Sequence, residues 1–219
     1  MSIMNPGEKH VACVLLVDIS GSMQGNSITE LNEALVEFGK ALREDAKAYG
    51  CTDVCVISFD SQVRTVFPFS SAMEYTAPSL SAGGMTAMNE AIITALDAID
   101  QRKQEYRAIG VDYWRPWLFL MTDGVPTDTN YEADAKRRLQ DALTRKKVNF
   151  FPMGIGSANT AKLKEYTLNG TGFVLKASAN NFKEAFIWVS SSMSAISNSN
   201  PYETRADMPP IPNTISIEL

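Results

Sequence analysis

The sequence predicts an α/β protein with a doubly wound, Rossmann-like and mostly parallel sheet of six strands and helices on both faces. Three observations predict this class. Short apolar runs alternate with helical patterns, the run VACVLLV at 11–17 is almost wholly apolar, and a very short link separates the runs at 53–60 and 62–69. An apolar run without alternation is typical of a strand covered on both faces. The short link predicts a hairpin, and therefore one antiparallel edge strand.

The first half of the chain supplies three strands and one long helix. After the first strand, apolar residues recur at steps of three and four, which predicts one buried helix stripe: Ile28, Leu31, Leu35, Phe38 and Leu42. Ser27 and Glu30 have the spacing of a capping box at the start of this helix. Pro68, in the second hairpin strand, suits an edge strand, because an edge residue can lack an N–H without losing a ladder bond.

The second half alternates strands and helices in the same way. A loop rich in Ser, Ala, Gly and Pro spans about 70–85 and leads into a helix whose apolar face holds Ala91, Ile92, Ala95, Leu96 and Ile99. Thr129 and Glu132 predict a second capping box. The remaining expected elements are strands at 116–123, 148–156 and 172–177, a helix with Leu139 and Leu143 inward, a short helix near 159–167, and a last helix carrying Phe182, Phe186, Val189, Met193 and Ile196. Right-handed crossovers then favour the strand order 3-2-1-4-5-6.

The expected domain organisation is an N-terminal extension at 1–9, one domain at 10–197, and a Pro-containing tail at 198–219. The tail segment MPPIP is compatible with an extended recognition segment and with a strap packed on its own domain. A packed strap predicts resistance to proteolysis near residue 200.

Composition narrows the function classes. The chain has 219 residues, 45% hydrophobic and 21% charged, with a formal net charge of -5. An acidic chain is a poor candidate for binding nucleic acid, because phosphates need a basic face. No apolar run approaches the roughly 18 residues of a membrane span. The polar N-terminus MSIMNPGEKH lacks the apolar core of a signal peptide, so a cytoplasmic protein is expected.

The cysteines and the single histidine argue against a zinc site. Cys13 and Cys55 lie within apolar runs. Cys51 and Cys55 lack a second pair of zinc ligands, and His10 is the only histidine in the chain. We expect all three to be buried, reduced thiols. His10 precedes the first strand and is expected to be a solvated residue at the amino end of the sheet.

Polar side chains gather where the winding of the predicted sheet reverses. Asp18 ends the first strand and Asp123 ends the strand at 116–123, which is its expected neighbour. Ser20 and Ser22 follow Asp18, and Thr86 follows Gly83 and Gly84 in a third loop. Ligands of doubly wound sheets bind beyond the carboxyl ends of the strands at this switch point. The sequence therefore predicts a ligand site there.

The chemistry of these five side chains favours a hard cation. Two carboxylates and three hydroxyls are oxygen donors of the kind that Mg²⁺ prefers, with Mn²⁺ or Ca²⁺ as substitutes. If the neutral hydroxyls bind directly, the ion stays electrophilic and seeks an anionic ligand. A Glu or Asp of a protein partner would supply it.

The motif DISGS at 18–22, Thr86 after GGM, and Asp123 in TDG resemble the metal-ion-dependent adhesion site of von Willebrand factor type A (VWA) domains. The resemblance covers residues 10–197. It implies that Ser20, Ser22 and Thr86 ligate Mg²⁺ directly in a partner-bound state. Asp18 and Asp123 would then hold the ion through water, or shift inward when no partner is present. Within the family the chain looks most like the stand-alone bacterial proteins associated with tellurium resistance and stress response, which are linked to a kinase and a phosphatase.

Two other functions compete with this hypothesis. The first is a Mg²⁺-dependent phosphohydrolase with Asp18 as nucleophile. The haloacid dehalogenase type carries a second aspartate two positions later, where this chain has Ser20, which cannot transfer a proton in that way. No well-placed general base is evident, so the chain is predicted not to be an enzyme. The second competitor is a structural subunit without metal.

Three methionines flank the predicted metal loops. Met88 is expected in the core, as is Trp117 in the strand at 116–123. Met23 and Met85 lie in loops at the predicted rim of the site, where flexible apolar side chains adapt to a partner. They are candidate partner-binding residues.

Overall fold

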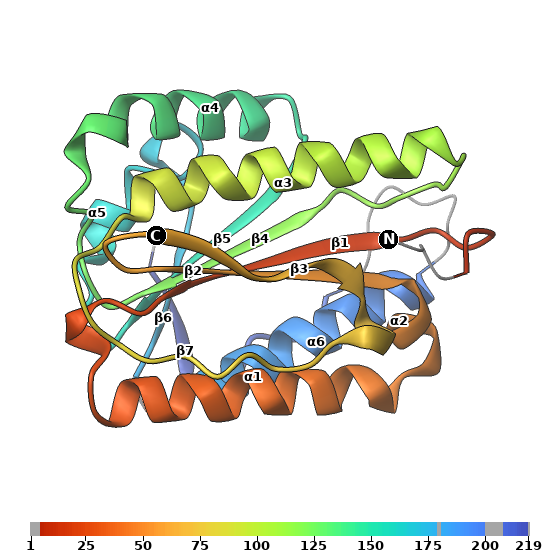
Figure 1. Cartoon of the computed structure of the whole chain (residues 1–219), viewed down its shortest axis with the longest axis horizontal. Helices are drawn as coiled ribbons and strands as arrows, with labels where there is room; N and C mark the ends of the chain where they lie inside the picture. Colours follow the sequence, from red (N-terminus) through yellow and green to blue (C-terminus); the bar gives the residue numbers. More distant parts are fainter. Residues whose placement is uncertain (1–4, 179–180, 200–207, 219) are drawn as a thin grey trace.

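The strands form one seven-stranded sheet in the order β3-β2-β1-β4-β5-β6-β7 (Figure 1). The computed structural model describes residues 5–178, 181–199 and 208–218. The strands are β1 (Val11–Asp18), β2 (Thr52–Phe59), β3 (Val63–Ser71), β4 (Trp117–Thr122), β5 (Asn149–Ile155), β6 (Val174–Ala177) and β7 (Ile215–Glu218). Strand β3 pairs antiparallel with β2, and β7 pairs antiparallel with β6, whereas the other pairs are parallel. The predicted class and the order of the first six strands are confirmed.

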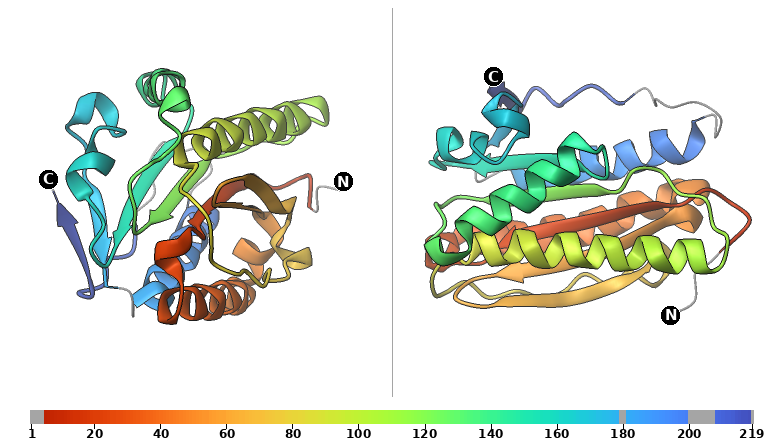
Figure 2. Two further views of the ribbon diagram at one scale, coloured as in Figure 1. Left: turned by 60° about the vertical axis from the view of Figure 1, so that its left-hand side comes forward. Right: turned by 90° about the horizontal axis from the view of Figure 1, so that it is seen from above.

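Helices cover both faces of this sheet, as predicted. They are α1 (Asn26–Glu44), α2 (Ala46–Cys51), α3 (Met88–Ala108), α4 (Glu132–Thr144), α5 (Thr160–Lys164) and α6 (Phe182–Asn198). Helices α1 and α6 lie on one face, and α3 and α4 lie on the other (Figures 1 and 2). Successive residues of β1 point to opposite faces, so Leu15 joins the core under α1 and α6 while Val14 and Leu16 join the core under α3. Every residue of β1 is buried.

The seventh strand comes from the C-terminal tail, for which the sequence predicted a tail or strap and no strand. The indole N–H of Trp188 donates to the carbonyl oxygen of Pro209 at 3.1 Å, and the Asn181 amide donates to that of Thr214 at 3.2 Å. Residues 208–218 therefore pack on the domain as a strap that ends in β7. The predicted proteolysis site near residue 200 lies outside the described residues.

Neither predicted capping box forms. Helix α1 begins at Asn26, two residues earlier than an N-cap at Ser27 would place it. Its N-cap is Gly25, whose φ of 82° favours glycine. Thr129 opens a short 3₁₀ turn, and α4 begins only at Glu132, without a side-chain cap. The S/T-x-x-E spacing alone does not fix where a helix begins.

His10 contradicts the prediction that it is solvated, because it is 0% exposed. Its Nδ1 lies 2.9 Å from Oδ2 of Asp53, at the amino end of the strands. The Tyr106 hydroxyl donates to the same carboxylate, and the Arg102 guanidinium lies 2.8 Å from its other oxygen. Burial opposes the charge of Asp53, but the hydrogen bond from His10 and the charge of Arg102 hold its pKa below the ordinary value. A buried ionic cluster thus supports the sheet at the end opposite the predicted ligand site.

The three cysteines, Cys13, Cys51 and Cys55, are buried, reduced thiols, as the sequence predicted. Burial raises the pKa of Cys55 to about 12, so this thiol is inert at neutral pH.

Candidate metal centre

Asp18 is fixed at the carboxyl end of β1 by two hydrogen bonds. The backbone N–H of Ser20 donates to its Oδ1 at 2.8 Å, and the Thr122 hydroxyl donates to its Oδ2 at 2.5 Å. The side chain is buried, since the residue is 1% exposed. Thr122, the last residue of β4, was missed by the sequence reasoning, although its place directly before Asp123 put it at the same edge.

Ser20, Ser22 and Asp123 form a chain of contacts between two loops. The hydroxyls of Ser20 and Ser22 lie 3.0 Å apart, and the Ser22 hydroxyl donates to Asp123 Oδ1 at 2.6 Å. Asp123 is separated from Ser22 by about a hundred residues of sequence. The parallel pairing of β1 with β4 brings them together.

The glycine-rich third loop packs tightly against the first. The N–H of Gly83 donates to the carbonyl of Ile19 at 2.8 Å, and the N–H of Gly21 donates to that of Gly84 at 3.1 Å. Gly84 has a φ of +77°, and a Cβ there would lie 2.7 Å from Ser61 Oγ. A side chain at this position would collide with Ser61, so glycine is what lets the third loop pack this closely against the turn that holds Ser61.

Thr86 completes the set. A Cβ added at Gly124 would lie 3.5 Å from Thr86 Oγ1 and 3.8 Å from Asp18 Oδ2, so both oxygens lie beside the same point of the Gly124 backbone. Thr86 is only 7% exposed. Within the described part of the chain, its hydroxyl makes no hydrogen bond, while its backbone is bonded to Thr127. The structure thus brings all five predicted residues to one edge of the sheet, and in the described part of the chain it leaves the Thr86 hydroxyl without a protein partner.

The electrostatics of this edge fit a cation. Burial, with a smaller contribution from the charge of Asp123, raises the pKa of Asp18 to about 6, although hydrogen bonds from Thr122 and Ser20 oppose the shift. Two carboxylates close together at a buried edge repel each other, and a bound cation removes that cost. The oxygen donors are hard and hydroxyl-rich, which suits Mg²⁺. Among the described residues, no three His, Cys, Asp or Glu side chains gather as a metal-binding group, so a site here depends on the hydroxyls.

Two hydrogen bonds between Thr86 and Thr127, here called the clasp, connect Thr86 to the loop that follows Asp123. The sequence did not predict them. The backbone N–H of Thr86 donates to Thr127 Oγ1 at 3.0 Å, and the N–H of Thr127 donates to the Thr86 carbonyl at 2.9 Å. Next to it, the Asp128 carboxylate accepts from the N–H groups of Asn89 and Glu90 and so caps α3. The sequence did offer a signal for Thr127 and Asp128, because the segment TDGVPTD places several polar residues directly after a buried strand.

We predict that Thr127→Val weakens Mg²⁺ binding about 10-fold, as loss of an outer-shell hydrogen bond typically does. Valine keeps the shape of threonine but cannot accept from the Thr86 N–H. Thr127→Ser restores the acceptor and is expected to restore affinity in a calorimetric titration. Thr129→Val, at an exposed position of the same loop, is the matched control. Equal affinity in Thr127→Val and wild type would show that the clasp does not position Thr86.

Met23 does not lie at the rim of the site, where the sequence placed it. That residue is 1% exposed and packs in the core, so the prediction that it contacts a partner is wrong. The short 3₁₀ turn Gly21–Met23 directs its side chain inward. Met85 is 58% exposed beside Thr86, and Val125, which was not predicted, is 46% exposed beside Asp123. Met88 and Trp117 are buried, as predicted.

Fold and site together define a class of protein: a doubly wound α/β domain whose switch point gathers hydroxyls and carboxylates from three loops. The sequence model of the von Willebrand factor type A domain matches residues 13–186. The chain belongs to this family. No helix in the described part of the chain is long and apolar enough to cross a membrane.

Solved structures support the fold. A von Willebrand factor type A protein from Catenulispora acidiphila is 18% identical with a TM-score of 0.64, over 86% of this chain and 43% of that one. The vWF domain of the type V pili tip protein Mfa5 from Porphyromonas gingivalis is 11% identical with a TM-score of 0.65, over 90% and 99%. The pilus adhesin SpaC from Lactobacillus rhamnosus GG, in its open conformation, is 12% identical with a TM-score of 0.68, over 86% and 30%. The chain thus spans less than half of the first relative. A search of curated proteins found no significant match.

Proposed function

We propose that this VWA domain binds Mg²⁺ at Asp18, Ser20, Ser22, Thr86 and Asp123, and uses the ion to capture a Glu or Asp side chain of a protein partner. The observation that carries the proposal is the Thr86 hydroxyl, which has no hydrogen-bond partner in the described part of the chain and lies beside the same glycine, Gly124, as the Asp18 carboxylate. A hydroxyl oxygen without a protein partner is available to ligate a hard cation, and the carboxylate beside it favours the charge of that cation.

The donor set favours recognition over catalysis. The three hydroxyls are neutral, so an ion that they hold keeps most of its charge and attracts a carboxylate. When bound, Mg²⁺ would supply an electrophilic position for that carboxylate. The chain's own residues orient the donors, because Thr122 holds Asp18 and Thr127 holds Thr86. VWA domains are commonly protein-interaction modules, and two of the similar structures are pilus proteins by their names, which supports an interaction function.

A phosphohydrolase with Asp18 as nucleophile is less well supported. The Asp18 carboxylate already accepts from the Thr122 hydroxyl and the Ser20 N–H, and its nearest hydroxyl-bearing neighbours are poor bases. Turnover of generic phosphate esters by pure protein, lost in Asp18→Asn, would favour this alternative.

The narrower assignment, to bacterial proteins of tellurium resistance and stress response, rests on sequence likeness alone. It makes an associated kinase or phosphatase a candidate partner.

The test is an affinity capture from cell extract, performed with Mg²⁺ and with EDTA and compared by mass spectrometry. The expected result is a set of proteins retained only with Mg²⁺ and lost with Thr86→Ala. Capture that persists both in EDTA and with Thr86→Ala would refute the mechanism and favour the metal-free structural subunit.

The apolar rim yields a second prediction. Met85→Ser combined with Val125→Ser is expected to weaken partner capture by about 10-fold, because anchors at the centre of an interface contribute roughly 1 kcal/mol or more each. Mg²⁺ affinity is expected to stay unchanged. Ile109→Ser, at the other end of α3 and 55% exposed, is the matched control. A double variant that captures the partner like wild type would exclude these side chains from the interface.

A further inference from the structure

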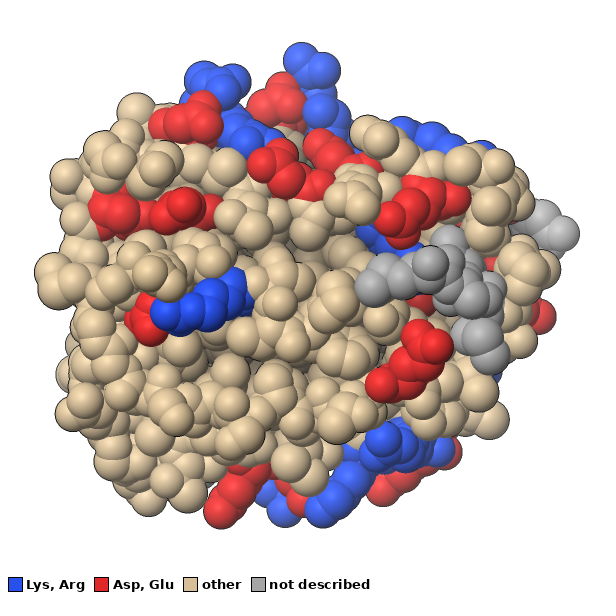
Figure 3. All heavy atoms as spheres, in the orientation of Figure 1, with Lys and Arg blue, Asp and Glu red and all other residues tan. Residues whose placement is uncertain are grey.

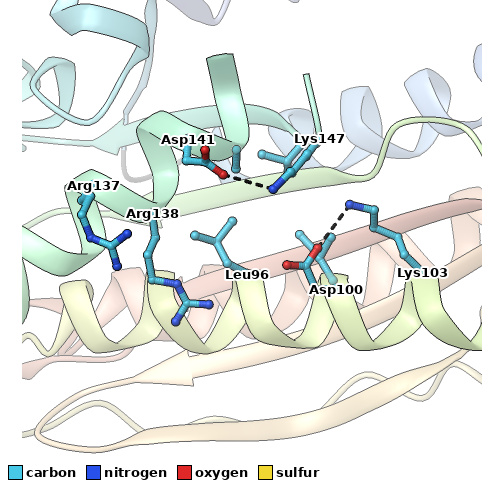
Figure 4. A pocket seen from close by; sticks show the side chains of 10 residues that line it. Leu96, Asp100, Lys103, Arg137, Arg138, Asp141 and Lys147 are labelled. Atoms are coloured by element: carbon cyan, nitrogen blue, oxygen red, sulfur yellow. Dashed lines mark hydrogen bonds and ion pairs between the residues drawn. The ribbon is translucent and has the colours of Figure 1, made fainter. Parts of the chain in front are cut away.

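A groove lies between α3 and α4 (Figure 4), and none of the five candidate metal ligands lines it. Its floor is apolar and is formed by Leu96, Ile99, Ala142 and Val148. Its volume is about 210 Å³. An apolar cavity of roughly 150 Å³ already holds benzene, so one aromatic or aliphatic side chain fits. Leu96 lies eight residues beyond Met88, the first residue of α3, which places the groove about 12 Å or more along the helix from the loop that carries Thr86.

Basic side chains surround this groove. In Figure 4, Arg137 and Arg138 lie at one end, Lys103 and Lys147 lie at the other, and Leu96 lies between them. The segment KRRLQDALTRKK at 136–147 holds six Lys or Arg and one Asp, in a chain of net charge -5. Figure 3 shows acidic and basic groups interleaved along the edge of α3 and α4, above a face with few charges.

Each cation that lines the groove has a carboxylate partner, but only two of these carboxylates belong to the lining. Asp97 pairs with Arg138, Asp134 with Arg137, and Asp100 with Lys103. Asp141 is shared by Arg145 and Lys147, at 2.6 and 3.0 Å. Lys146 has no ion-pair partner among residues 5–178, 181–199 and 208–218. Arg145 and Lys146 lie outside the groove lining. The lining itself holds four cations and two carboxylates, Asp100 and Asp141, which is an excess of two positive charges among the residues that a docked segment would touch.

We propose that this groove is a second docking site, for a protein segment with one apolar side chain between acidic residues. The apolar side chain would occupy the space above Leu96. The flanking carboxylates would approach Arg137 and Arg138 at one end and Lys147 at the other, where guanidinium–carboxylate pairing gives strong, directional hydrogen bonds. This binding needs no metal, so it is independent of the function proposed above.

The test uses a fluorescein-labelled peptide, acetyl-Glu-Glu-Phe-Glu-Glu-amide, and the full chain in low salt. The expected result is saturable binding by fluorescence anisotropy, equal in Mg²⁺ and EDTA and unchanged by Thr86→Ala. Arg137→Glu with Arg138→Glu is expected to weaken binding at least 10-fold. Lys40→Glu, a lysine-to-acid change on the far face in α1, should have no effect.

Two further measurements distinguish binding in the groove from nonspecific attraction between the charged peptide and the protein. Ala142→Leu fills the groove without changing charge and is expected to weaken binding about 10-fold. A peptide with Gly in place of Phe should bind the wild-type protein as weakly as the original peptide binds Ala142→Leu. The proposal is overturned if no saturable binding occurs, if Ala142→Leu binds like wild type, or if Lys40→Glu weakens binding as much as the arginine changes do.

Discussion

Asp53→Ala is expected to lower the free energy of unfolding by about 3–5 kcal/mol, the typical effect of removing one partner of a buried ion pair. The Arg102 side chain is 1% exposed, and the variant leaves its charge with only the partly exposed carboxylate of Glu105, at 2.8 Å. The Tyr106 hydroxyl and His10 Nδ1 lose the same partner. Because many domains have only about 5–15 kcal/mol of stability, this change threatens folding itself.

Urea denaturation of Asp53→Ala and wild type measures this loss. Glu37→Ala removes surface ion pairs with Lys40 and Lys183 and is the matched control, with little expected loss of stability. If Asp53→Ala costs less than about 1 kcal/mol, the cluster does not stabilise the fold.

The same carboxylate gives the stability a pH dependence. The pKa of Asp53 is lower in the folded chain than in the unfolded chain, despite the opposing effect of burial. Its contribution is therefore fully present above its unfolded pKa of about 3.9 and is lost as the pH falls through the folded pKa. The advantage of wild type over Asp53→Asn should shrink on acidification below about pH 4. An advantage that is constant with pH would contradict this assignment.

Thr86→Ala is expected to weaken Mg²⁺ binding by at least about 10-fold, which is the lower end of the effect of losing even an outer-shell group. In EDTA its stability should stay within about 1 kcal/mol of wild type. The reason is that the hydroxyl bonds to no side chain or backbone group in the described part of the chain, whereas the backbone bonds of Thr86 remain in the variant. Thr129→Ala is the control. Calorimetry gives the affinity and thermal unfolding gives the stability; normal Mg²⁺ affinity in Thr86→Ala would remove this residue from the site.

The sheet and the site were predictable from sequence because both follow from strong, local signals. Apolar runs such as 11–17 mark buried strands, and crossover handedness then fixes their order. That strand order alone brings Asp18 beside Asp123, although neither aspartate by itself indicates a metal site in its own loop. The family motif supplied Ser20, Ser22 and Thr86, and the structure places them at the same edge.

The misses have physical reasons. Strand β7 is short and lies in a polar, proline-containing tail, so its strand character comes from pairing with β6 and not from its own pattern. His10 is polar and precedes a strand, and its burial depends on Asp53, a partner 43 residues away. The side chain of Met23 turns into the core because of the backbone of one short turn. None of these tertiary effects leaves a periodic signal in the sequence.

The central claim is that five side chains at the carboxyl edge of the sheet bind one Mg²⁺ per chain. Isothermal titration calorimetry of the wild-type protein with MgCl₂, after EDTA treatment and dialysis, tests it most directly. The account predicts one saturable site, for which Mn²⁺ competes, and its loss in Thr86→Ala. Absence of saturable binding at millimolar Mg²⁺, or an equal site in Thr86→Ala, would contradict it.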